Sequence, residues 1–220
     1  MDVELNETSE ALSLPEWAEL GGHDSRRHIF ATPQWNRLWW DAFGPGKDLI
    51  VLTFRDPHPV GLAALMIDET EQGRRMRFLG GDDLTDYLGP IVAGDVHLPA
   101  VADALLGFLV DYPKWDYFDA KCLPVPFGFA EWLVESADRR GMEFTIDQDD
   151  LSLVLGLPTS VEAYFLSLPQ KKRHELKRKL RRFDAAVPDA VLRRANADTL
   201  EADLATFEAM HRISEGDKGD

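Results

Sequence analysis

The sequence predicts an α+β domain in which helices flank a mixed, largely antiparallel sheet. Three β-rich runs, 49–54, 60–67 and 74–79, are joined by connections too short for a crossover, so they should form an antiparallel meander. The hydrophobic period then changes, and two helical patterns alternate with a further strand. A meander followed by alternating helices and strands indicates helices layered on one sheet.

Local signals place the other elements in order along the chain. Thr32 followed by Pro33 marks a helix start, because the hydroxyl can cap the helix and proline suits its first turn. Thr159 and Glu162 form a capping box for a later helix. The expected helices are 33–43, 98–110, 129–140, one ending at 168, 171–182 and 199–213, and the further strands are 87–92, 115–120, 143–147, 151–155 and 190–194.

These elements fall into three parts. Residues 1–25 are acidic and weakly patterned, and we expect a weakly ordered lead-in there. Residues 26–156 hold one full series of helices and strands and should form the first domain. Residues 157–220 form a second block of helices with one strand.

Composition limits the class of protein and its surroundings. A hydrophobic content of 45% and a charged content of 29% are typical of a globular protein. The most apolar stretch, 101–110, is too short to span a bilayer, so we expect no membrane insertion. The single cysteine, Cys122, excludes an internal disulfide and favours a cytoplasmic location. The six histidines do not cluster at metal-ligand spacing, so no metal site is expected, and no motif indicates an oligomeric state.

One short segment carries a charge opposite to that of the whole chain. The net charge is −15, which argues against general nucleic-acid binding, yet residues 171–182 contain eight Lys and Arg and one Glu. Ser167 and Gln170 resemble a capping box for this helix, and Leu176, Leu180 and Phe183 share one face that should be buried. The helix either binds an anion or is a solvated charged helix, and the residues leave both open. The proposed substrate-binding cations are Arg173, Lys177, Arg178 and Arg181.

The order of elements resembles the GNAT acyltransferase fold, and two such halves are typical of the Fem-type and CelD-like group. The resemblance implies that residues 157–220 begin a second GNAT-like half, which stops before its own meander, so the chain is expected to be truncated. The resemblance rests on short motifs spread over 30–211. They are Phe30-Ala31-Thr32-Pro33-Gln34-Trp35 with Trp39-Trp40, Arg77-Phe78-Leu79-Gly80-Gly81 with Asp86-Tyr87-Leu88-Gly89-Pro90, the helix 173–182, and Leu204-Ala205-Thr206-Phe207-Glu208-Ala209-Met210-His211.

The resemblance implies acetyl-CoA, or another acyl donor, for the full-length family member. A half that binds this donor needs a loop Gln/Arg-x-x-Gly-x-Gly/Ala that opens a helix and holds the pyrophosphate on backbone N–H groups. The best match here ends at Asp82, whose carboxylate would repel a diphosphate. The first half is therefore expected to be non-catalytic, with no cofactor-binding residues, and we expect no tight binding of an acyl donor to this chain.

Asp86 and Tyr87 are candidate acceptor-positioning residues. They follow the third strand of the meander, together with Asp82 and Asp83, near the opening that GNAT folds use for ligands. A carboxylate and a phenol there could position an acceptor amine, whereas an exposed acidic loop is the competing interpretation. No catalytic residue is identified.

Two functions of different classes remain. The first is a GNAT-type acyltransferase in cell-envelope or polysaccharide metabolism, which moves an acetyl or aminoacyl group to an amine. The cations of 171–182 would then suit an anionic small molecule, a nucleotide-linked substrate or transfer RNA. The alternative is a non-enzymatic module that binds an anion or a nucleic acid through the same helix. Binding of acyl-CoA separates the two, because only the intact enzyme should bind it.

Overall fold

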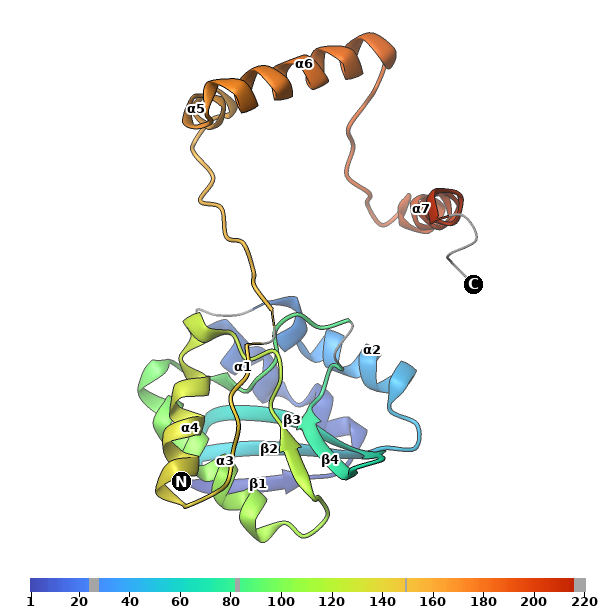
Figure 1. Cartoon of the computed structure of the whole chain (residues 1–220). Helices are drawn as coiled ribbons and strands as arrows, with labels where there is room; N and C mark the ends of the chain where they lie inside the picture. The colour runs from blue at the N-terminus through green and yellow to red at the C-terminus, as the bar shows by residue number, and fades with distance from the viewer. Residues whose placement is uncertain (24–27, 82–83, 149, 216–220) are drawn as a thin grey trace. The chain divides into compact units, whose positions relative to one another are not determined.

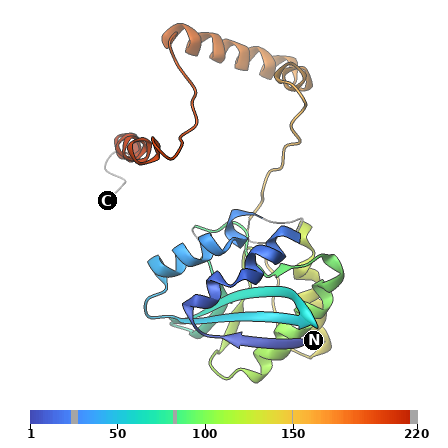
Figure 2. The same ribbon diagram turned by 180° about the vertical axis from the view of Figure 1, so that it is seen from behind.

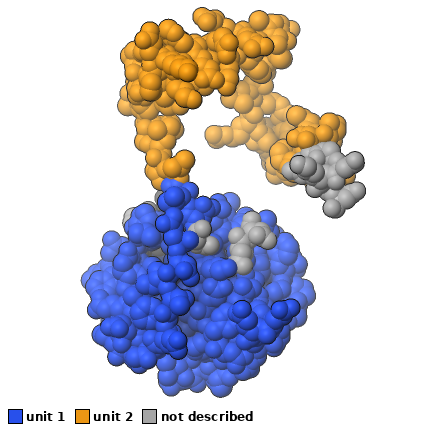
Figure 3. Space-filling model, in the orientation of Figure 1, with its two compact units in different colours: residues 1–152 blue, residues 153–220 orange. Residues whose placement is uncertain are grey.

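The computed structural model describes residues 1–23, 28–81, 84–148 and 150–215. The chain divides into two compact units, Met1–Ser152 (unit 1) and Leu153–Asp220 (unit 2), which Figure 3 shows in different colours. The division lies inside the run 151–155, which the sequence predicts to be a strand.

Unit 1 is built on a mixed, largely antiparallel sheet, as the sequence predicts. The main path is β1-β2-β3-β4-β6, and every neighbouring pair in it is antiparallel except β4 and β6, which are parallel. Figure 2 shows β1 at the edge of the sheet, next to β2. The strands are β1 (Asp2–Asn6), β2 (Asp48–Asp56), β3 (His58–Thr70), β4 (Gly73–Phe78), β5 (Ile91–Val92) and β6 (Tyr117–Asp119).

Helices cover both faces of this sheet, so unit 1 has two hydrophobic cores. Helices α3 (Leu98–Asp111) and α4 (Phe129–Arg139) pack on the face that holds Ile50 and Leu52. Helices α1 (Pro15–His23) and α2 (Pro33–Phe43) pack on the face that holds Leu49 and Val51 (Figure 1). Because successive residues of a strand point to opposite faces, β2 is apolar and buried through most of its length. The predicted cap of α2 is confirmed, since Trp35 N donates to Thr32 Oγ1 at 3.2 Å.

A loop interrupts the sheet edge next to β3. Strand β4 pairs with β3 as far as Leu65, and β5 then pairs antiparallel with Gly61 and Leu62 of the same strand. Strands β4 and β5 therefore run in the same direction along one edge of β3, separated by residues 79–90. The chain leaves the edge at Gly80 and Gly81, whose φ angles of 138° and 71° favour glycine.

The expectation of a weakly ordered lead-in at 1–25 is wrong for the residues described, which end at 23. Strand β1 pairs with β2 over all five of its residues. A short 3₁₀ helix, η1 (Ser9–Ser13), and α1 follow, and both contribute to the core through Leu12 and Trp17. The sequence does not reveal this, because each element is short and its stability comes from packing on the sheet rather than from a local pattern.

Three predicted strands are also absent from the described residues. The segments 143–147, 151–155 and 190–194 form no ladder with another strand. A strand requires a hydrogen-bonded partner, and alternating sequence alone does not supply one. Strand β6 is likewise limited to three residues, although the run 115–120 is longer.

Unit 2 consists of helices joined by irregular segments: α5 (Val161–Ser167), α6 (Gln170–Ala186) and α7 (Leu200–Glu215). None of its described side chains is buried. The expected burial of the apolar face of α6 is wrong: Leu180 and Phe183 are 50% and 55% exposed, and Leu176 is half-buried. A helix buries its apolar face only against a facing surface, and the described part of unit 2 provides none. The predicted cap is also wrong, because Pro169 precedes α6 without a side-chain hydrogen bond.

Candidate functional site

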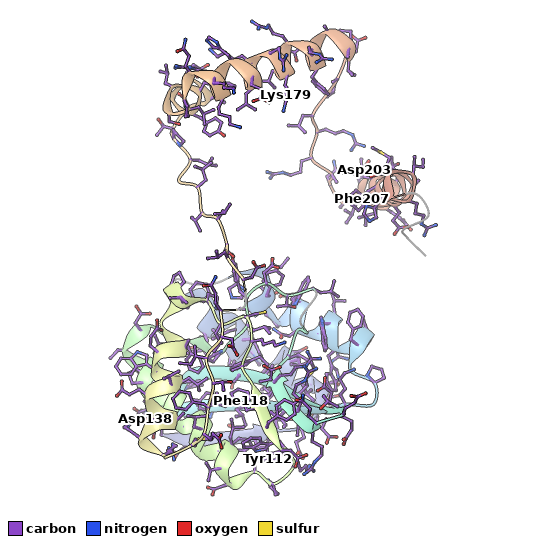
Figure 4. All side chains as sticks on the ribbon, in the orientation of Figure 1. Tyr112, Phe118, Asp138, Lys179, Asp203 and Phe207 are labelled. Carbon is purple, nitrogen blue, oxygen red and sulfur yellow. The ribbon has the colours of Figure 1, made fainter. Side chains whose placement is uncertain are left out.

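Helix α6 carries the predicted substrate-binding cations on one side of its apolar stripe. At 3.6 residues per turn, Arg173, Lys177 and Arg181 form one row, and Arg178 lies beyond it. The other four cations of the helix lie on the opposite side of the stripe, around Glu175, and are Lys171, Lys172, Lys179 and Arg182. Figure 4 shows the side chains of α6 projecting from the helix, with Lys179 labelled. The helix thus offers two cationic surfaces, each with four cations.

The two surfaces differ in their carboxylate partners. On the second side, Lys179 forms an ion pair with Glu175 at 3.3 Å, and this hydrogen bond lowers the pKa of the Glu175 carboxyl. On the first side, Lys177 Nζ lies 5.5 Å from the centroid of the Phe165 ring of α5, a cation–π contact. Within the described residues, none of the four predicted cations forms a salt bridge with a carboxylate. The first side therefore has the stronger unbalanced positive field.

Asp86 and Tyr87 lie in unit 1, in the loop 79–90, and so not on the same unit as the four cations. Asp86 is exposed. Tyr87 is half-buried, and its hydroxyl donates to Ser152 Oγ at 3.5 Å. Asp82 and Asp83, named with them in the sequence, lie outside the described residues. No carboxylate is seen to contact the Tyr87 hydroxyl in the described part of the chain, and the role of Asp86 and Tyr87 in positioning an acceptor stays a prediction.

Tyr87 belongs instead to a cluster of aromatic rings that the sequence did not reveal. His28 stacks on Phe127 with ring centroids 5.8 Å apart, and Tyr87 meets both rings edge-on at 5.5 and 6.1 Å. A small hollow beside the cluster lies near the ends of β4 and β6. It is lined mainly by apolar side chains, namely those of His28, Ala31, Leu88, Pro90, Leu123, Pro124, Phe127 and Phe129, with Gly89. Its walls come from three separate loops, so no local pattern could have indicated it.

The described residues of unit 1 do not fit an acyl-CoA pyrophosphate. The loop that opens α3 is 93–98, and two of its N–H groups are already used: His97 N donates to Gly94 O at 3.2 Å, and Leu98 N donates to Asp95 O. Pro99 has no N–H, and the carboxylate of Asp95 would repel a diphosphate. The motif at Arg77–Asp82 does not open a helix either, because the next described element is the strand β5.

A charged network at the end of the sheet has a structural role. Asp68 on β3 accepts from Arg75 at 3.0 Å and pairs with Arg77 at 2.8 Å, and Asp119 on β6 lies 3.5 Å from Arg75. Burial acts to raise the pKa of Asp68, but the hydrogen bond from Arg75 and the charges of both arginines outweigh it, so the pKa is lowered. These ion pairs link β3, β4 and β6.

Comparisons with protein-family models, with curated proteins and with solved structures found no match to this chain. In the part of the chain that the structure describes, no group of three or more His, Cys, Asp or Glu side chains could hold a metal ion. No described helix is both long enough and apolar enough to cross a membrane.

Proposed function

We propose that the chain belongs to an amine N-acyltransferase of the GNAT superfamily, in the two-domain arrangement of the CelD-like and Fem-type group. The observation that carries the proposal is the topology of unit 1. Two helices separate β1 from β2, an antiparallel meander follows, and α3 then leads to β6, which pairs in parallel with β4. This order and pairing are those expected of a GNAT half. Acetyl or aminoacyl transfer to an amine is the reaction that such a fold implies.

In this proposal, unit 1 is the domain that does not bind the acyl donor. In the loop before α3, His97 and Leu98 already donate their N–H groups within the protein, and the loop after β4 leads to a strand rather than a helix, so we derive no chemical step through acyl-CoA in this chain. Helix α6 contributes the binding of an anionic or nucleotide-linked substrate. Arg173, Lys177, Arg178 and Arg181 hold its phosphates, because they face one side without a paired carboxylate.

A pair of matched variants tests the role of α6. The probe is uridine diphosphate, titrated into the full chain by calorimetry at 20 mM and at 150 mM salt. We expect measurable binding at low salt that weakens by roughly tenfold at 150 mM, since exposed charges are screened. Replacing the four cations named above by glutamine should abolish it. The control replaces Lys171, Lys172, Lys179 and Arg182, which removes the same charge from the other side of the stripe and should leave most of the binding intact.

Two results would oppose this proposal. Equal loss of binding in the two variants would mean that the helix acts only through its net charge. Tight binding of acetyl-CoA that salt does not weaken would mean that a donor site exists in these residues, contrary to the account of unit 1.

A non-enzymatic anion- or nucleic-acid-binding module is the second candidate. The observation in its favour is the eight cations of α6, on a helix whose described charged side chains reach solvent. Titration with a single-stranded RNA of about 20 nucleotides separates the candidates, because a charged groove or helix for nucleic acid follows a backbone over several phosphates. Binding of the RNA with no binding of uridine diphosphate would favour the module.

A further inference from the structure

Strand β1 forms an open edge of the sheet in unit 1. It pairs with β2 through Asp2–Asn6, and no described strand pairs with its other side (Figure 2). In an antiparallel pair only alternate residues bond to the partner, so β1 keeps N–H and C=O groups that point outward. Such groups are a ready template for another strand, and β1 contains neither the lysine nor the proline that often protects an edge.

A groove runs beside this edge, between β1 and α3. Its volume is about 490 Å³, and its mostly small, apolar walls include Met1, Val3, Ala100, Ala104, Gly107 and Phe108. Its charged residues are Asp103 and Arg140, which pair at 3.0 Å, and Asp111. Just beyond the ends of the two elements, the Tyr112 hydroxyl donates to Glu7 Oε1 at 2.7 Å, so β1 and α3 end side by side. A strand added to β1 would therefore continue the sheet over this groove.

The opposite face of β1 carries an excess of carboxylates. Asp2 and Glu4 alternate with Val3, so their side chains point to the face on which α1 packs. Glu4 and Glu16 of α1 share one cation, Arg55, at 2.9 and 3.5 Å. Asp2 is exposed and forms no salt bridge with any described residue. One face of the edge is thus apolar and grooved, and the other is negatively charged.

We propose that β1 is a docking edge for an extended basic segment of another protein, in which cationic and apolar side chains alternate. The added strand bonds to the outward N–H and C=O groups of β1. Its apolar side chains lie over the groove, where Ala100 and Ala104 leave room for them. Its cationic side chains fall on the other face beside Asp2 and Glu4, because opposite charges on neighbouring strands attract.

A second copy of this chain fits the edge less well. Two-fold pairing of β1 with β1 keeps each face of the sheet continuous, so Asp2 and Glu4 of both copies would meet on one face. Like charges on neighbouring strands repel, and each chain carries a net charge of −15. The docking edge lies in unit 1, and it depends neither on the cations of α6 nor on an acyl donor.

Hydrogen exchange on the full chain, followed by NMR, tests the docking. The probe is a capped peptide of about eight residues in which lysine alternates with valine, long enough to span β1. We expect the outward amides of Asp2–Asn6 to exchange at least about tenfold more slowly with the peptide bound. A peptide with glutamate in place of each lysine should give no protection.

Matched variants separate the edge from the general acidity of the protein. Fluorescence anisotropy of a labelled peptide gives its affinity. The double variant Asp2→Asn with Glu4→Gln should weaken binding by about three- to tenfold. The control, Glu69→Gln with Glu71→Gln, removes the same charge from exposed positions of the β3–β4 hairpin and should leave the affinity unchanged.

A further variant, Ala100→Trp, fills the groove from an exposed position of α3 and should weaken binding by at least about fivefold, with an unchanged circular dichroism spectrum.

Three outcomes would overturn the proposal. Equal losses in the two double variants would mean that the peptide responds only to net charge. Binding without slower exchange in β1 would place the peptide elsewhere on the protein. Protection of β1 without peptide, growing with protein concentration, would mean that a second copy of the chain covers the edge.

Discussion

Replacing Leu12 by alanine measures whether the first twenty residues belong to the fold of unit 1. The side chain is fully buried in the cluster that also holds Trp17, Leu20 and Trp39. Leu→Ala changes at such sites cost about 2–5 kcal/mol, because a cavity adds to the lost transfer energy. Since η1 is held between α2 and β2 and can collapse little, we expect a loss near 3–4 kcal/mol. That is a large part of a typical total of about 5–15 kcal/mol.

Urea unfolding followed by far-UV circular dichroism gives the free energy of unfolding by linear extrapolation. The control is Leu5→Ala on β1, where the side chain is 41% exposed, and a loss below about 1 kcal/mol is expected there. Equal, small losses in the two variants would refute the reasoning. The lead-in would then contribute little to the stability of unit 1, in line with the weak order that the sequence alone predicted for it.

Three further predictions concern single residues or ligands. Asp68→Asn should lower the free energy of unfolding by about 1–3 kcal/mol at pH 7. Because the pKa of Asp68 is lowered in the folded state, the extra stability of the wild type should be fully present above the unfolded-state pKa and should be lost as pH falls through the folded-state pKa. A difference in stability that stays constant from pH 7 to pH 2 would contradict this. Gly73→Ala should lower the free energy of unfolding by more than about 1 kcal/mol, because the φ angle of Gly73 is +119° and an added Cβ would lie 2.8 Å from Asp116 Oδ2. Thermal unfolding measures the loss, and an unchanged Tm would show that the alanine causes no strain. Calorimetry with acetyl-CoA should give no tight binding, because His97 and Leu98 in the loop before α3 already donate their N–H groups within the protein.

The elements that the sequence predicted well are those whose signal is local. The β2–β3–β4 meander follows from alternation and short turns, and α2 from Thr32 and Pro33. The lead-in could not be predicted, because β1 and η1 gain their order from contacts with residues far along the chain. The segments 143–147 and 151–155 show the opposite error, since their pattern is strong but none of the described strands pairs with them.

The same distinction applies to the candidate sites. The cations of α6 could be found from the sequence, because helical periodicity alone places Arg173, Lys177 and Arg181 in one row. The ring cluster of His28, Tyr87 and Phe127 could not, since it requires three loops to converge at the ends of β4 and β6. Tyr87 was named for a different reason, as the partner of a carboxylate, and the structure places it in the ring cluster beside an apolar hollow. A site built from one element is readable in a sequence, whereas a site built from several loops depends on the topology of the sheet that positions them.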